Sequence, residues 1–558
     1  MIERPGRDEL LFLPLGGCGE IGMNLNLYGH DGKWLMVDLG ITFGNEATPG
    51  IDVIMPDPAF IAERRSDLLG LVLTHAHEDH IGAVPYLWPR LRCPIYATPF
   101  TAAVLRRKLA EADLLGEARI TEIPMSGSFT LGPFEIELIS ITHSIPEPNA
   151  VVLRTRLGNV LHTGDWKLDP DPVVGPITDE AALRRLGGQG VLAMVCDSTN
   201  VLVDGSSGSE AEVRQSLDEL IGRFRQRVAV ACFASNVARI ESVTRAALAH
   251  GRHVGLVGRS LWRMVEAAQE TGYLTDLPDF VGEEDIGHLP RESILMICTG
   301  SQGEPRSALA RIARDEHPDV ALEPGDATIF SSRIIPGNEH AIGELHNALI
   351  RRGVEVVTEK DHFVHVSGHP ARDELAEMYR WVKPAVAVPV HGELRHLRAH
   401  VALAESCQVR QSVLAENGSL LRLAPGRAEV IGEVESGRLA LDGTHLTAMG
   451  GPALKSRQRM AYSGAAVATV VLDAAGRLVG EPQLTVHGLA AEGEGEEEAR
   501  AEAATAARQA LAALPPGKRG DDHAVKEVVR LAIRRSLNAY HGKKPLTDVH
   551  LIRLPAVS

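Results

Sequence analysis

Three histidines and an aspartate fall within six residues, at His75, His77, Asp79 and His80. They directly follow the apolar run 71–74, which has the composition of a buried strand. Imidazole nitrogen and carboxylate oxygen are the ligands that Zn²⁺ and Mn²⁺ prefer, and a strand exit would hold them in one turn facing a cavity. The cluster therefore predicts a metal-dependent hydrolase; a histidine-rich surface loop is the simpler alternative.

Three further candidate ligands stand at the ends of predicted strands. His143 follows the strand 134–141, Asp165 lies in a Gly-containing turn, and His391 follows the strand 385–390. Taken singly, each could be a cap or a solvated group. Together they complete two ligand sets with Asp165 bridging: His75, His77 and His143 for one ion, and Asp79, His80 and His391 for the other.

The pattern of predicted strands and helices that must position these residues differs between regions of the chain. The first two hundred residues alternate short β-branched runs with Gly-rich turns, which predicts a strand-rich layered domain. From about residue 210 to 357, helical stretches alternate with apolar strands, as in a parallel α/β unit. The strand 385–390 then resumes the earlier pattern, so one domain is predicted to be inserted into another. A smaller unit follows a break near residues 450–452.

Composition sets limits on the function. The chain has 558 residues, 44% of them hydrophobic, and a formal net charge of −16, which argues against coating nucleic acid by bulk attraction but not against nucleic acid as a substrate. The six cysteines are scattered, so no disulfide framework is indicated. There is no secretory-signal layout near the N-terminus and no apolar run of roughly 18 residues, so we expect a cytoplasmic protein without a membrane span.

The metal motif resembles that of the metallo-β-lactamase superfamily. The resemblance rests on His75-x-His77-x-Asp79-His80 together with Asp38, His143 and Asp165. It implies an α/β fold, an αββα sandwich with two divalent metal ions at its edge, most readily Zn²⁺, with Mn²⁺ or Mg²⁺ as alternatives. Asp38 matches the aspartate that supports the metal ligands from behind.

Three later motifs resemble the β-CASP branch of that superfamily, whose members process nucleic acids. They are Asp197 in the segment 196–200, His369 in the segment 365–369, and His391, and a histidine at this third position goes with RNA-directed members. Within the branch, segments 15–24, 233–236, 299–304 and 335–339 look like the bacterial ribonuclease J family. The resemblance runs from about residue 10 to 395 and more weakly beyond; Cys18, where an aliphatic residue is expected, is a mild departure.

The resemblance implies a domain plan and an activity. The plan is a metallo-β-lactamase domain in residues 1–207 and 367–430, an inserted β-CASP domain in 208–366, a linker in 431–457 and a small C-terminal α/β domain in 458–558. The activity is metal-dependent hydrolysis of single-stranded RNA by a metal-bridging hydroxide, with 5′-to-3′ exonuclease and endonuclease cleavage and a favoured 5′-monophosphate end. Ribosomal RNA processing and mRNA decay are the implied processes.

Site roles follow from both lines of reasoning. The expected catalytic residues are Asp79, Asp165, Asp197 and His369. His369, oriented by Asp197, is the candidate general acid, and His365 is the alternative. Small and hydroxyl residues with free backbone N–H groups suit phosphate, although each segment could be only a tight turn. The expected phosphate-binding residues are Ala234, Ser235, Asn236, His365, Val366, Ser367, Gly368 and His369.

The C-terminal domain and the inserted domain bear on the expected partners and on two alternative functions. The C-terminal domain is expected to mediate a homodimer or homotetramer, and RNA-degradation partners are possible. A non-catalytic scaffold would keep the fold but usually loses ligands, and all seven candidates are present here. A hydrolase of small thioesters or lactams would share the metal motif but have no use for an inserted domain of this size.

Overall fold

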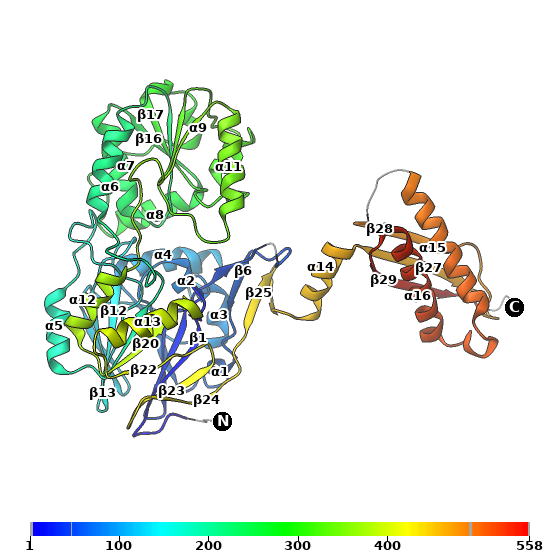
Figure 1. Cartoon of the computed structure of the whole chain (residues 1–558), viewed down its shortest axis with the longest axis horizontal. Coiled ribbons are helices and arrows are strands. Elements are labelled where there is room, and N and C mark those ends of the chain that lie inside the picture. Colours follow the sequence, from blue (N-terminus) through cyan, green and yellow to red (C-terminus); the bar gives the residue numbers. More distant parts are fainter. Residues whose placement is uncertain (1–3, 46, 490–493, 556–558) are drawn as a thin grey trace. The chain divides into compact units, whose positions relative to one another are not determined.

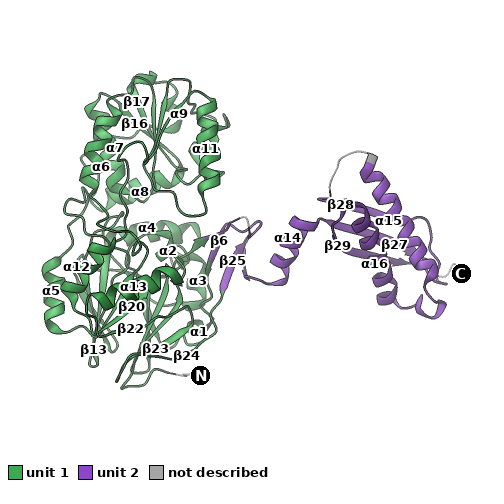
Figure 2. Cartoon of the chain, viewed as in Figure 1, with its two compact units in different colours: residues 1–42, 55–437 green, residues 43–54, 438–558 purple. Residues whose placement is uncertain are grey.

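The computed structural model describes residues 4–45, 47–489 and 494–555 (Figure 1). The chain divides into two compact units, which are coloured separately in Figure 2. The first comprises residues 1–42 and 55–437, and the second comprises residues 43–54 and 438–558. The chain crosses between the units within β5 (Thr42–Phe43), within β6 (Val53–Pro56) and after residue 437.

The first unit contains a large mixed sheet of eight strands. Its order is β24-β23-β1-β3-β4-β7-β8-β9, antiparallel from β24 to β4 and parallel from β4 to β9. The strands are β1 (Leu10–Gly16), β3 (Leu25–His30), β4 (Lys33–Val37), β7 (Leu68–Val72), β8 (Ile95–Ala97), β9 (Ile120–Glu122), β23 (Ser419–Ala424) and β24 (Glu429–Glu433).

A second sheet of seven strands has the order β10-β11-β12-β13-β14-β20-β22. It is antiparallel up to β13 and parallel from β13 to β22. The strands are β10 (Ser128–Leu131), β11 (Phe134–Ser140), β12 (Asn149–Thr155), β13 (Gly158–His162), β14 (Ala193–Asp197), β20 (Val386–Val390) and β22 (Gln411–Ser412).

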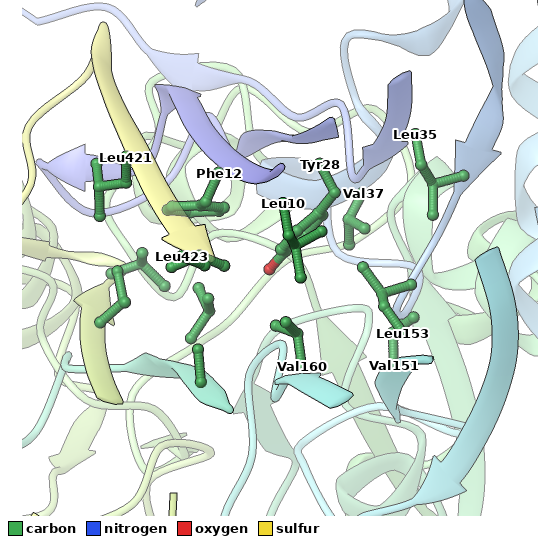
Figure 3. Close-up of a cluster of buried hydrophobic side chains, with 14 of the residues drawn as sticks. Leu10, Phe12, Tyr28, Leu35, Val37, Val151, Leu153, Val160, Leu421 and Leu423 are labelled. Carbon is green, nitrogen blue, oxygen red and sulfur yellow. The ribbon is translucent and has the colours of Figure 1, made fainter. Parts of the chain in front are cut away.

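The two sheets enclose one apolar core. Figure 3 shows Leu10, Phe12 and Val37 of the first sheet facing Val151 and Val160 of the second. Burying such side chains contributes roughly 1.5–3 kcal/mol each, so this face fixes how the sheets stack. Helices cover the outer faces: α1 (Ala59–Ala62), α2 (Glu78–Ile81), α3 (Val84–Leu91) and α4 (Pro99–Glu111) on the first sheet, and α5 (Glu180–Gln189), α12 (Arg372–Val382) and α13 (Leu394–Ser406) on the second. The predicted αββα sandwich is confirmed.

A third sheet belongs to the inserted domain. This sheet is wholly parallel, with the order β16-β17-β15-β18-β19. The inserted domain lies in the chain between β14 and β20, which are neighbouring strands of the second sheet. Its strands are β15 (Val228–Ala231), β16 (His253–Val257), β17 (Ile294–Cys298), β18 (Ala327–Phe330) and β19 (Glu355–Val357). Its helices are α6 (Glu210–Ile221), α7 (Val237–Ala249), α8 (Arg259–Glu270), α9 (Glu283–Ile286), η1 (Arg291–Ser293), α10 (Ala308–Ala313) and α11 (Glu339–Arg351).

The second unit ends in a small α/β domain. Its sheet has the order β28-β27-β29, and alternate residues of β27 point into a core that α15 and α16 share. The elements are β27 (Ala465–Leu472), β28 (Gln483–His487), α15 (Glu494–Ala513), η2 (Pro516–Lys518), α16 (Asp522–His541) and β29 (Leu546–Arg553).

The predicted linker 431–457 carries regular structure. It contains β25 (Arg438–Asp442) and β26 (His445–Ala448), and α14 (Pro452–Ser463) begins within it. The domain boundaries themselves stay predictions. Across the described part of the chain, the helices include none with the length and apolar character of a membrane span.

Candidate metal centre

The candidate ligands meet at one edge of the sandwich because strands that run in the same direction end there. His75 and His77 lie in the turn after β7, and α2 follows at once with Asp79 and His80 in its single turn. The remaining ligand candidates come from the second sheet: His143 after β11, Asp165 after β13 and His391 after β20. Asp197, a predicted catalytic residue, lies at the end of β14. The structure thus brings all seven predicted ligands together.

The first ligand set consists of three imidazoles. His77 Nδ1 lies 3.1 Å from His75 Nε2 and 3.0 Å from His143 Nε2. The Thr74 hydroxyl donates to Asp38, so it accepts from His75 Nδ1 at 2.9 Å, and the Gly368 carbonyl accepts from His143 Nδ1. These acceptors place the protons of His75 and His143 on Nδ1 and their lone pairs at a shared point. Converging lone pairs on buried nitrogens fit a metal cation.

Burial keeps these imidazoles neutral. It lowers the pKa of His77 to about 4 and holds the pKa values of His75 and His143 well below the usual value. Neutral imidazole is the form that binds a metal ion, so this set is ready for one at neutral pH.

The second ligand set adds carboxylates. Asp165 Oδ2 lies 3.1 Å from His80 Nε2, and Asp165 Oδ1 lies 3.1 Å from His391 Nδ1. Asp79 Oδ2 lies 3.1 Å from His391 Nε2. Burial opposes charge on His80 and His391, but the carboxylates around them raise both pKa values well above the usual range. Protons and divalent cations therefore compete for these two rings.

Asp165 lies between the two sets. Its Oδ2 is 4.0 Å from His143 Nε2 of the first set, in addition to its contact with His80 of the second. The neighbouring histidines, His391 foremost, hold the pKa of this buried carboxyl well below its usual value against the effect of burial. This carboxylate therefore lies close to both ligand sets, and its bridging of two ions stays a prediction.

Asp38 supports the motif from behind. It accepts hydrogen bonds from the Thr74 backbone N–H at 2.8 Å and from His80 Nδ1 at 2.7 Å. The second bond places one His80 proton on Nδ1, so Nε2, beside the carboxylates, is the nitrogen for which a second proton and a metal ion would compete. Asp38 has a left-handed backbone, with φ of 63°, and His391 has φ of 51°, conformations that cost a non-glycine residue free energy and cluster at functional sites.

The Asp38→Asn variant is expected to bind Zn²⁺ roughly 10–100-fold more weakly than the unmodified protein. The amide can still accept from Thr74, but its NH₂ group would meet His80 Nδ1 and favour the tautomer that carries the proton on Nε2. Equilibrium dialysis against Zn²⁺ measures the loss. Asp67→Asn, which removes an aspartate bound to Arg4 and Lys33, is the matched control. Unchanged Zn²⁺ affinity in Asp38→Asn would contradict the role.

Asp197 and His369 form a pair beside the second set. His369 Nδ1 lies 2.8 Å from Asp197 Oδ2 and 3.8 Å from Asp165 Oδ2. Burial lowers the pKa of His369, but Asp197 and Asp165 outweigh it and the pKa is raised. Burial together with nearby Arg239, Lys167 and Arg333 instead holds the pKa of His365 well below its usual value. Of the two candidate acids, His369 is therefore the one whose surroundings favour the protonated form.

Asn200 fixes the loop that carries His369. Its side-chain amide donates to Ser367 Oγ at 2.7 Å and to the His369 carbonyl at 3.1 Å, and Arg333 donates to its oxygen at 3.3 Å. Gly368 packs so closely that a Cβ there would lie 2.8 Å from His143 Nδ1. Within the same loop, the Val366 side chain is buried. Neither Asn200 nor Thr74 has a predicted role from the sequence, although Asn200 lies in the segment 196–200 and Thr74 directly precedes His75.

The segment Ala234, Ser235 and Asn236 lies at the start of α7 in the inserted domain. Asn236 caps this helix by accepting from the Arg239 N–H at 2.9 Å, and its amide donates to Glu210 at 3.3 Å. Its side chain is therefore occupied within the inserted domain. Phosphate binding by this segment stays a prediction.

A separate group of possible ligands, Glu283, His317 and Asp319, does not fit a metal ion. His317 Nδ1 accepts from the backbone N–H groups of Asp319 and Val320 at 3.3 and 3.2 Å. The proton of the neutral ring must then be on Nε2, which faces Glu283 at 3.5 Å. No lone pair remains for a cation, and the Glu283 contact is an ordinary polar interaction.

The sandwich and its histidine–aspartate cluster define a metallo-hydrolase of the metallo-β-lactamase class. The family model "Metallo-beta-lactamase superfamily" matches residues 23–223, and "Zn-dependent metallo-hydrolase RNA specificity domain" matches residues 353–411. Enzymes of this superfamily bind divalent metal ions, in keeping with the ligand sets described above. A crystal structure of a protein of unknown function from Enterococcus faecalis has a similar fold, with a TM-score of 0.51 and 14% identity over 74% of this chain and 100% of that one.

Two further matches give the particular family. The model "Ribonuclease J, beta-CASP domain" matches residues 225–349, and "Ribonuclease J C-terminal domain" matches residues 452–554. The chain is 46% identical to Ribonuclease J of Sinorhizobium meliloti over 98% of both chains, and 39% identical to Ribonuclease J of Mycolicibacterium smegmatis over 95% of both. The chain belongs to the ribonuclease J family, a family of metal-dependent hydrolases that act on RNA. The predicted family and enzyme class are confirmed.

Proposed function

We propose that this chain holds two divalent metal ions, Zn²⁺ before Mn²⁺ or Mg²⁺, and uses them to hydrolyse phosphodiester bonds in single-stranded RNA. The observation that carries the proposal is Asp165, whose carboxylate lies between a set of neutral imidazoles and a set of carboxylates and histidines. When bound, two ions at such a centre activate water at neutral pH and neutralise charge on the phosphate.

The chain's own residues orient the reaction and move a proton. Asp79 and Asp165 would hold the second ion, and Asp165 would also contact the first and so fix the two ions relative to each other. His369, fixed by Asp197, donates a proton to the leaving 3′ oxygen. The raised pKa of His369 supports this role, and the lowered pKa of His365 leaves that ring to contact phosphate instead.

Substrate preference is proposed to come from the loop 365–369. The Ser367 hydroxyl and the backbone around Gly368 lie against Asn200 and His143, so a phosphate bound there sits beside the metal ligands. A 5′ monophosphate in this place would set the cleavage point one nucleotide away and give 5′-to-3′ exonuclease action. Internal cleavage needs only that the RNA pass over the same site.

The biological setting is part of the proposal. RNA maturation and decay, including ribosomal RNA processing and mRNA decay, are the processes in which such an enzyme acts in the cytoplasm. The small C-terminal domain is proposed to join chains into a homodimer or homotetramer, and RNA-degradation partners are compatible with this arrangement. Size measurement with and without residues 458–558 tests the oligomer.

The proposed function predicts a dependence on the 5′ end of the RNA. With Zn²⁺ or Mn²⁺ present, mononucleotide release from a 5′-monophosphorylated single strand is expected to be at least about tenfold faster than from its 5′-triphosphorylated form, a difference of ~1.4 kcal/mol. Internal fragments should appear at equal rates from both, because they do not use the end. Denaturing gels of uniformly labelled RNA separate the released mononucleotides from internal fragments.

Equal mononucleotide release from both substrates would remove the phosphate pocket. Absence of any RNA hydrolysis with metal present would remove the proposed function itself. A chelator-treated sample provides the metal-free control, and a lactam or thioester substrate tests the rival hydrolase.

A further inference from the structure

Glu147 is a buried carboxylate in the loop between β11 and β12, four residues after the candidate ligand His143. It is only 5% exposed, and its backbone is left-handed, with φ of 56°. Burial raises the pKa of its carboxyl despite the hydrogen bonds that it accepts. A non-glycine residue keeps such a conformation only where its surroundings hold it in place.

Two parts of the molecule hold Glu147. Its Oε2 accepts a hydrogen bond from the Phe100 N–H at 2.8 Å, in the first turn of α4. Its Oε1 accepts from the Tyr273 hydroxyl at 3.2 Å, and Tyr273 follows α8 in the inserted domain. The carboxylate therefore joins the sandwich and the inserted domain through the loop that carries His143.

The same loop is tied to the metal motif at its other end. The Asn149 N–H donates to the Thr74 carbonyl at 3.1 Å, and the Asn149 side chain donates to the Glu147 carbonyl at 2.7 Å. His143 is thus flanked on one side by β11 and on the other by a segment pinned to Thr74. A displacement of Glu147 would shift this segment and, with it, the His143 ring.

The contacts between α4 of the sandwich and α8 of the inserted domain are more exposed. Helices α4 and α8 face each other through the ion pairs Arg107–Glu270 at 2.8 Å and Arg263–Glu111 at 2.9 Å. Their side chains are 26–58% exposed, and pairs of this kind contribute little to stability. The part-buried Tyr273–Glu147 hydrogen bond, by contrast, reaches the loop that carries His143.

We propose that Tyr273 of the inserted domain is a positioning residue for the first metal centre: through Glu147 it sets the loop so that His143 Nε2 lies opposite His77. The inference rests on the proposed metal-dependent function. It couples metal binding to docking of the inserted domain, and such coupling is reciprocal: tighter docking strengthens metal binding, and bound metal strengthens docking.

The Tyr273→Phe variant tests the inference because it removes one hydroxyl and leaves the ring in place. We expect Zn²⁺ affinity to fall about fivefold or more, and peptides covering residues 141–150 to exchange amide hydrogens faster than in the unmodified protein. Titration calorimetry and hydrogen exchange measure these effects without RNA. Arg263→Ala is the matched control, since it removes an α4–α8 ion pair that does not touch the loop.

A conservative pair of variants separates positioning from general damage. Glu147→Ala should reproduce the loss seen in Tyr273→Phe, whereas Glu147→Gln should retain most Zn²⁺ affinity. The glutamine oxygen can accept from Phe100 N–H while its NH₂ group donates to the Tyr273 hydroxyl oxygen.

The results separate the positioning role of Tyr273 from the proposed metal-dependent function. If Tyr273→Phe matches the unmodified protein in Zn²⁺ affinity and exchange, or if Arg263→Ala causes the same loss, the positioning role is overturned. If the unmodified protein itself neither binds Zn²⁺ nor hydrolyses RNA, the proposed function fails instead.

Discussion

The Asp165→Asn variant is expected to hydrolyse single-stranded RNA at least ~10³-fold more slowly than the unmodified protein at saturating metal. The substitution removes the negative charge that lies 3.1 Å from ring nitrogens of both His80 and His391 and within 4.0 Å of His143. The asparagine amide can offer one oxygen to one ion, so the two centres would lose their shared ligand. Metal content should fall below that of the unmodified protein.

Single-turnover RNA hydrolysis and elemental analysis of the same preparation measure both effects. Asp473→Asn, at a half-buried aspartate of the C-terminal domain that pairs with Arg477, is the control and should leave both unchanged. Asp165→Asn with full metal content and undiminished hydrolysis would contradict a bridging role and, with it, the proposed mechanism.

His369→Ala is expected to slow RNA hydrolysis by about 10²–10⁴-fold, the range that general acid catalysis usually supplies. Metal content should stay close to that of the unmodified protein, because His369 belongs to neither predicted ligand set and bonds to Asp197 instead. A phosphodiester with a nitrophenyl leaving group needs little protonation, so its hydrolysis should be far less affected. This contrast between the two substrates separates an acid from a residue that only binds.

The pH dependence provides a second readout for His369. The acid acts when protonated, and its pKa is raised above the usual histidine value, so its contribution is present at lower pH and lost as the pH rises through that raised pKa. The alkaline decline should disappear in His369→Ala and remain in His365→Ala, because burial keeps His365 neutral. If His365→Ala alone removes the decline, the assignment of the acid is reversed.

The sequence by itself determined the class of chemistry. Three histidines and an aspartate directly follow the apolar run 71–74. A strand and a turn are enough to make them face one cavity, so their spacing alone predicts a metal site. The separate candidates His143, Asp165 and His391 could be found because each follows a predicted strand. Residue type and strand order are local properties, and they were enough to predict a strand-rich layered domain and the candidate ligands, whereas the αββα sandwich was implied by the family resemblance.

Other site features were beyond the sequence. The segment 234–236 has the composition of a phosphate site, but a helix cap has the same composition, and the structure uses Asn236 as a cap. The left-handed backbones of Asp38, Glu147 and His391 also leave no mark in residue type, because only the packing around them holds them there.

Only the tertiary structure decided which distant groups touch. Asp197 bonds to His369 across 172 residues, and Tyr273 reaches Glu147 across 126 residues. Such pairs depend on how the inserted domain leaves between β14 and β20 and returns, which is set by sheet register and the packing of two cores. Local spacing contains no information on a register between strands almost two hundred residues apart. For this reason the sequence identifies the candidate metal ligands, whereas the fold decides their tautomers, the place of Asp165 between the two sets and the residues that hold them.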